Sequence, residues 1–200
     1  MPRKLAIVMF DDVEVLDFAG PYEVFAVARD IQTNEPLFDV YLVAEDLRPI
    51  TARNRLSINP HYTFFTAPEP DIVLVPGGDG RRRQMYNPAL LEWVAGRGQA
   101  AEHVLSVCTG AFILAGAGLL HGLAATTYHR SFEELAAFAP DVQLRPGQRW
   151  VDNGKVITSA GVSAGIDMAL HVIEVLHGPD QALHTARYME YEYYPRHAAD

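Results

Sequence analysis

Cys108 is the only cysteine in this 200-residue sequence, and it follows an apolar segment typical of a buried strand. We expect that strand over residues 103–107 and a helix of small residues over 111–117. A tight turn between a strand and a helix lifts one side chain out of the sheet and is called a nucleophile elbow. The helix N-terminus would bring partial positive charge and free N–H groups to the sulfur. The sequence therefore predicts a thiolate at Cys108 that reacts near neutral pH, with a buried core cysteine as the alternative.

A glycine pair could complete such a site. Gly77 and Gly78 come directly after an expected β-branched strand over residues 71–75. If this loop abuts the elbow, the N–H groups of Gly78 and Thr109 could form a two-donor oxyanion hole. The alternative for Gly78 is an ordinary turn between a strand and a helix.

Asp17 is the candidate acid. It lies where the loop after the first expected strand ends and an expected helix over residues 17–28 begins. Its commonest role at such a place is to cap that helix. The alternative is a carboxyl group that points at Cys108. A partly buried, protonated Asp17 would donate a hydrogen bond to the thiolate or a proton to a substrate.

Short apolar segments alternate with helical ones along the whole chain. We expect strands over 4–10, 38–44, 56–58, 71–75 and 103–107, a hairpin over 151–158, and helices over 17–28, 88–96, 111–117, 163–176 and 179–189. This alternation predicts a single α/β domain over residues 1–200, a three-layer sandwich with a mostly parallel central sheet flanked by helices. Sites in such sheets form beyond the carboxyl ends of the strands. Three loops that meet there carry the candidate residues: 11–21, 76–81 and 108–109.

Composition limits the partners that we expect. The formal net charge of −9 argues against nucleic acid, and no segment has the length of a membrane span or the pattern of a signal peptide. A single cysteine fits a reducing compartment, so we expect a cytoplasmic protein. The sequence contains no clear metal-ligand spacing, phosphate-binding loop or dinucleotide fingerprint. We therefore expect no metal and no cofactor.

Five short motifs occur in an order that resembles the ThiJ/PfpI superfamily, which has the class I glutamine amidotransferase-like fold. They are Val-Pro-Gly-Gly at 75–78, Ser-Val-Cys-Thr-Gly at 106–110, Ala-Gly-Leu-Leu-His-Gly at 117–122, Ala-Thr-Thr at 125–127 and Thr-Ser-Ala-Gly-Val-Ser-Ala-Gly-Ile-Asp-Met-Ala-Leu at 158–170. The resemblance covers about residues 4–188. Within the superfamily, residues 17–24 and 106–110 resemble the isonitrile hydratase group most closely, and they also resemble sensor domains fused to AraC-type regulators.

The resemblance implies a role for each matching residue. Cys108 matches the nucleophile of the elbow, and Asp17 matches the acidic residue that contacts its sulfur. Thr109 matches the residue that acts through its backbone and hydroxyl, and Gly78 matches the oxyanion-hole glycine. The resemblance also implies a homodimer that acts on a small molecule.

The sequence departs from the superfamily at two places. Thr109 stands where PfpI-type proteases have histidine, which weakens a Cys-His-Glu protease interpretation. Tyr128 stands where many members have the histidine of Thr-Thr-His, and His129 follows one place later. Both are candidate substrate-binding residues, with packing or surface roles as the alternatives.

The function that we expect is that of a cofactor-free cysteine enzyme acting on a small carbon–nitrogen or carbonyl substrate. The resemblance favours hydration of an isonitrile to an N-substituted formamide. A glyoxalase or deglycase activity is the second possibility, and a ligand-binding or redox-sensing protein without turnover is the third.

Overall fold

The computed structural model describes residues 1–194 and contains a seven-stranded sheet with the order β10-β11-β7-β6-β1-β2-β5. The strands are β1 (Arg3–Val8), β2 (Phe38–Ala44), β5 (Tyr62–Thr63), β6 (Ile72–Val75), β7 (His103–Val107), β10 (Trp150–Asp152) and β11 (Val156–Ser159). Only β10 runs antiparallel to its neighbour among these strands. The carboxyl ends of the six parallel strands therefore lie at one edge of the sheet.

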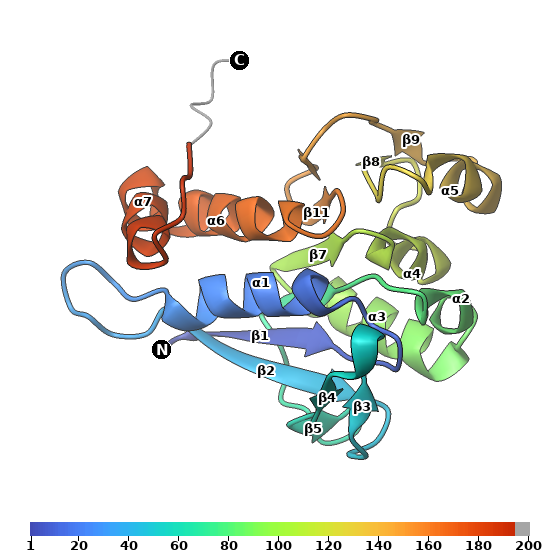
Figure 1. Cartoon of the computed structure of the whole chain (residues 1–200), viewed down its shortest axis with the longest axis horizontal. Helices are drawn as coiled ribbons and strands as arrows, with labels where there is room; N and C mark the ends of the chain where they lie inside the picture. Colours follow the sequence, from blue (N-terminus) through green and yellow to red (C-terminus); the bar gives the residue numbers. More distant parts are fainter. Residues whose placement is uncertain (195–200) are drawn as a thin grey trace.

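Helices cover both faces of the sheet. On one face α1 (Val15–Val27), α6 (Ala164–His177) and α7 (Pro179–Tyr188) pack against one another, and on the other lie α2 (Arg81–Gln84), α3 (Pro88–Ala100) and α4 (Gly110–Gly116) (Figure 1). The three-layer α/β architecture predicted from the sequence is thus confirmed.

Two small additions flank the main sheet. One is a hairpin of β3 (Ile50–Thr51) and β4 (Ser57–Ile58), joined by the turn η1 (Arg53–Arg55). The other contains β8 (Ala124–Ala125), α5 (Phe132–Phe138) and β9 (Gln143–Leu144), and it lies beside β10 and β11. Both bring charged residues toward the edge where the parallel strands end.

The central strands are apolar along their length because both faces are covered. Residues 5–8 of β1 and 72–75 of β6 are fully buried, and Leu5 pairs in register with Val40 of β2 and Ile72 of β6. This explains why continuous apolar segments, and not alternating ones, mark these strands in the sequence.

The structure changes several predicted boundaries. The first strand ends at Val8 and not at residue 10, α1 begins at Val15 and not at Asp17, and α3 continues to Ala100. Six short elements, α2, α5, β3, β5, β8 and β9, were not predicted from the sequence. The single domain predicted over 1–200 stays a prediction, and its residues 195–200 lie outside the described residues.

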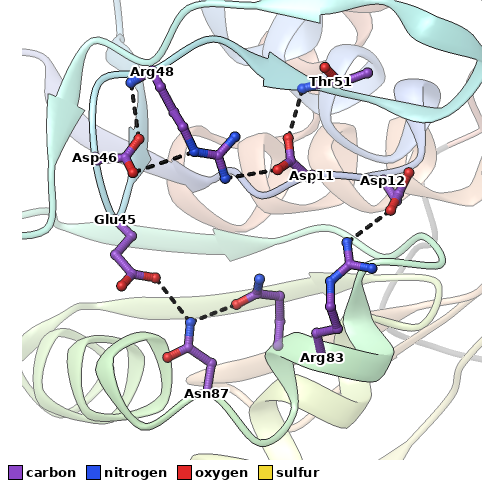
Figure 2. A network of polar contacts seen from close by, with 9 residues as sticks. Asp11, Asp12, Glu45, Asp46, Arg48, Thr51, Arg83 and Asn87 are labelled. Atoms are coloured by element: carbon purple, nitrogen blue, oxygen red, sulfur yellow. Dashed lines mark hydrogen bonds and ion pairs between the residues drawn. The ribbon is translucent and has the colours of Figure 1, made fainter.

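The loop that leads from β1 into α1 is held by ion pairs. Asp11 contacts Arg48 at 2.8 Å and accepts a hydrogen bond from the N–H of Thr51, while Asp12 contacts Arg83 at 2.8 Å (Figure 2). The hydrogen bond from Arg48 lowers the pKa of the Asp11 carboxyl, so this ion pair persists at neutral pH. These contacts fix the start of α1, and with it Asp17.

Candidate active site

Cys108 occupies the turn between β7 and α4, as the sequence predicts. Its backbone has a φ of 58°, the left-handed region that non-glycine residues rarely adopt. The Cys108 N–H donates to the carbonyl groups of Ser159, the last residue of β11, and of Ala160, which follows it. A β-carbon at Gly110 would lie 2.1 Å from the carbonyl oxygen of Val75, so only glycine permits this close approach of the elbow to β6. The strained backbone is thus held from both neighbouring strands.

Asp17 does not cap its helix. It lies in the first turn of α1 and is fully buried. Its two carboxyl oxygens accept hydrogen bonds of 3.1 Å from the N–H groups of Gly77 and Val162. The carboxyl group also interacts with the side chain of Cys108. The capping role is therefore wrong, and the alternative in which Asp17 faces the sulfur is correct.

The environment raises the pKa values of both Asp17 and Cys108. Burial raises the pKa of Asp17 to about 7, although its hydrogen bonds with Cys108, Gly77 and Val162 oppose the shift. Burial and the negative charge of Asp17 raise the pKa of the Cys108 thiol, and this outweighs the stabilising contacts from Thr109. The predicted free thiolate near neutral pH is therefore wrong for the resting site. Near neutral pH the thiol therefore keeps its proton, while the carboxyl group of Asp17 is close to its own titration point.

Thr109 links the elbow to the glycine pair. The N–H of Gly78 donates to the Thr109 hydroxyl at 3.1 Å. The predicted oxyanion role of Gly78 would require this hydrogen bond to open. The Thr109 N–H, which lies beside the sulfur, has a hydrogen bond to Cys108 that lowers the thiol pKa. Through its hydrogen bond with the N–H of Gly78, the hydroxyl of Thr109 positions the loop that holds Asp17.

A cavity of about 250 Å³ opens above the sulfur. Its lining residues are Glu14, Arg53, Gly78, Asp79, Arg81, Arg82, Cys108, Thr109, Tyr128, Arg130, Ser131, Glu134 and Val162. A β-carbon at Gly161 would lie 2.6 Å from the Tyr128 ring and 3.5 Å from the Cys108 sulfur, so the ring lies close to the sulfur. His129 is exposed and does not line the cavity, although its ring packs on Tyr128. The structure therefore brings Tyr128, but not His129, to the candidate site.

Comparison with known proteins identifies the family. Residues 3–175 match the DJ-1/PfpI family. The chain belongs to this family. It is 35% identical over 191 residues to an isonitrile hydratase of Pseudomonas putida, an alignment that covers 96% of this chain and 79% of that protein. A crystal structure of a ThiJ/PfpI family protein from Pseudomonas syringae superposes with a TM-score of 0.86 at 31% identity, covering 100% of this chain and 79% of the other.

More distant relatives of this DJ-1/PfpI protein differ in function. A deglycase of Pyrococcus horikoshii is 25% identical over 164 residues, covering 81% of this chain and 87% of that protein. An HTH-type transcriptional regulator of Pseudomonas aeruginosa is 26% identical over 191 residues, and the chain spans 51% of its length. The structure of Drosophila melanogaster DJ-1beta, with a TM-score of 0.82 at 17% identity over 96% of this chain and 100% of that chain, shows the same fold. The family therefore includes enzymes and regulators.

Several residues of the candidate site in this family member were not predicted from the sequence. Val162 holds Asp17 through its N–H group, and Arg130 and Glu134 line the cavity from the unpredicted region around α5. Val162 follows β11 at the same edge as the other three loops. Because sites form beyond the carboxyl ends of parallel strands, its position could have been predicted. Nothing in the sequence pattern places Glu134 there, because α5 is short and lies outside the main sheet.

Within residues 1–194 no group of three or more His, Cys, Asp or Glu side chains is placed to hold a metal ion. In the same part of the chain no helix combines the length and apolar character that a membrane span requires.

Proposed function

We propose that this DJ-1/PfpI protein is a cysteine enzyme that hydrates a small isonitrile to the N-substituted formamide. One observation carries the proposal: a buried Asp17, with a pKa raised to about 7, faces the thiol of Cys108 at the floor of a cavity. An acid whose pKa lies near the working pH can both donate and accept a proton. The similarity to the isonitrile hydratase of Pseudomonas putida supports this choice of substrate.

The first step joins the sulfur to the substrate. The Asp17 carboxylate accepts the thiol proton while Cys108 attacks the terminal carbon of the isonitrile, and Asp17 then gives that proton to the same carbon. A carbon–sulfur bond and a carbon–hydrogen bond form, and the product is a thioimidate on Cys108. Splitting one difficult addition into covalent steps is the advantage of a nucleophilic residue.

The second step regenerates the free enzyme. The Asp17 carboxylate takes a proton from water as the water oxygen adds to the thioimidate carbon, and the substrate nitrogen receives that proton. The carbon–sulfur bond then breaks, the formamide carbonyl forms, and the sulfur recovers the hydroxyl proton. The Thr109 N–H, beside the sulfur, would stabilise the sulfur as it leaves.

Formamide release from a panel of small isonitriles tests the proposal. We expect turnover by the wild type, no turnover by Cys108→Ala, and a loss of about 100-fold or more for Asp17→Asn, since general acid–base catalysis contributes on this scale. Asp180→Asn is the matched control, because Asp180 is also in the first turn of a helix but is exposed. Equal turnover by the wild type and Cys108→Ala would refute the proposed nucleophile.

The same samples test the alternative activity. Methylglyoxal is offered in a parallel assay, and lactate release without formamide release would favour the glyoxalase and deglycase interpretation. The greater identity to the isonitrile hydratase, 35% against 25% for the deglycase, favours the hydratase. Absence of turnover in both assays would favour a ligand-binding or redox-sensing role.

The assembly and location of the protein remain predictions. For the homodimer we expect a sedimentation mass of about twice the 22.1 kDa of one chain. Cell fractionation would test the predicted cytoplasmic location.

A further inference from the structure

The charged side chains around the cavity above Cys108 are paired in all cases but one. Arg53 contacts Glu14 at 3.0 Å and Asp79 at 3.6 Å. Arg82 contacts Glu134 at 3.1 Å, and the buried Arg81 contacts the same carboxylate. These three carboxylates are thus already engaged by arginines.

Arg130 is the remaining cation. It lines the cavity, and among the described residues no hydrogen-bond or ion-pair partner of its guanidinium is found. The cavity lining therefore carries four arginines against three carboxylates, and the excess positive charge is that of Arg130. An unpaired guanidinium beside a cavity is suited to bind a carboxylate through two parallel hydrogen bonds.

The loop that carries Arg130 is fixed relative to the sulfur. The Thr127 hydroxyl donates to the carbonyl oxygen of Cys108 at 2.8 Å, and the N–H of Ser131 donates to the carbonyl oxygen of Tyr128 at 2.8 Å. These hydrogen bonds anchor the backbone around Arg130 to the elbow. Its guanidinium can act on a substrate whose reactive carbon lies at the sulfur.

The lining offers little to an apolar substituent. Tyr128 and Val162 are its only large apolar side chains, and most of the other lining residues are charged. A hydrocarbon group would displace water from these charges without replacing their hydrogen bonds. We infer that the substrate carries an anionic substituent, a carboxylate in the simplest case, and that Arg130 binds it. This inference rests on the proposed function for the identity of the reacting group, but not for the preference for negative charge.

Alkylation of Cys108 tests this inference without requiring turnover. Because Cys108 is the only cysteine of the chain, mass spectrometry of the intact protein reports its reaction alone. N-iodoacetylglycine and N-iodoacetylglycinamide are nearly equal in size and differ in one negative charge. The ratio of their rates, divided by the same ratio for 2-mercaptoethanol, measures the preference of the cavity for the anion.

We expect Arg130→Gln to lower this normalised ratio about threefold to fivefold, the scale of an exposed charge pair. Arg130→Lys should retain most of the preference, because it keeps the charge. Arg187→Gln is the matched control, since Arg187 is also exposed but lies on α7 away from this cavity, and it should leave the ratio unchanged. A ratio unchanged in Arg130→Gln, or lowered equally in Arg187→Gln, would overturn the inference.

A second assay separates this inference from the proposed function. Formamide release is compared for 3-isocyanopropanoate and 3-isocyanopropanamide. A kcat/KM higher for the carboxylate in the wild type, and reduced selectively by Arg130→Gln, supports both. An alkylation preference without formamide release refutes the isonitrile proposal and leaves the preference for an anion in place. Formamide release with equal kcat/KM for the two substrates overturns the inference alone.

Discussion

The titrations of Asp17 and Cys108 are coupled because their side chains are in contact and the negative charge of Asp17 disfavours the thiolate. Full burial disfavours the carboxylate of Asp17, and its charge in turn disfavours the thiolate of Cys108. The N–H groups of Gly77 and Val162 keep the carboxylate accessible near neutral pH. Asp17 can therefore both donate a proton to a substrate and accept one near neutral pH.

This pair makes stability depend on pH. The pKa of Asp17 is raised from 3.8 to about 7 in the folded protein, so the folded state binds more protons than the unfolded state between these values. Stability is then greatest below the unfolded pKa and falls as the pH rises through the folded pKa. We expect the wild type to lose free energy of unfolding relative to Asp17→Asn from pH 5 to pH 7, with a limiting slope of about 1.4 kcal/mol per pH unit.

Urea unfolding of both proteins at pH 5, 6, 7 and 8 measures this difference. Asp17→Asn also lowers the free energy of unfolding by an amount that does not depend on pH, because an amide donor replaces a carboxyl oxygen that accepts an N–H. Only the change with pH reports the titration. A difference between the two proteins that stays constant from pH 5 to pH 8 would show that the folded pKa is not raised.

At the scale of elements, the sequence predicts the strands that end at the site better than the loops that complete it. The strand before Cys108 was placed at its observed residues 103–107, since a continuous apolar segment followed by small residues permits few alternatives. The position of Val162 beyond β11 could be predicted, but its hydrogen bond to Asp17 could not, because that contact depends on how α1 packs against α6. Likewise, α5 brings Glu134 to the cavity although it belongs to no repeating strand–helix unit.

The loop after β6 shows how closely these elements meet. A β-carbon at Gly77 would lie 2.6 Å from the N and Oγ1 atoms of Thr109 and 2.9 Å from Oδ2 of Asp17. We expect Gly77→Ala to destabilise the fold by about 1–3 kcal/mol, the usual cost of overpacking. It should also reduce the alkylation rate of Cys108, since the added methyl group displaces the residues around the sulfur.

Gly96→Ala is the matched control for this change. Gly96 lies within α3, and a β-carbon there would meet no atom within 4 Å. Alanine should therefore stabilise that helix by about 0.5–1 kcal/mol. Thermal unfolding and alkylation of both variants test the argument, and a Gly77→Ala protein as stable and reactive as Gly96→Ala would contradict it.

At the scale of the whole molecule, α6 connects the candidate site with the end of the described chain. The turn before α6 contains Val162, which holds Asp17. One turn further along, Asp167 pairs with Arg149 from the segment before β10 and accepts a hydrogen bond of 2.8 Å from the Tyr191 hydroxyl. The segment after α7 thus packs back onto the helix that begins at the site.

We expect this contact to contribute to the stability of the whole fold but not to the chemistry at the sulfur. Tyr191→Phe removes one hydrogen bond to a charged group, so the free energy of unfolding should fall by about 1–2 kcal/mol. Tyr188→Phe should change it little, because Tyr188 is 70% exposed. Urea unfolding gives both values, and the alkylation rate of Cys108 should be the same in the two variants. If Tyr191→Phe instead slows alkylation while Tyr188→Phe does not, the segment after α7 would influence the orientation of Asp17 through α6.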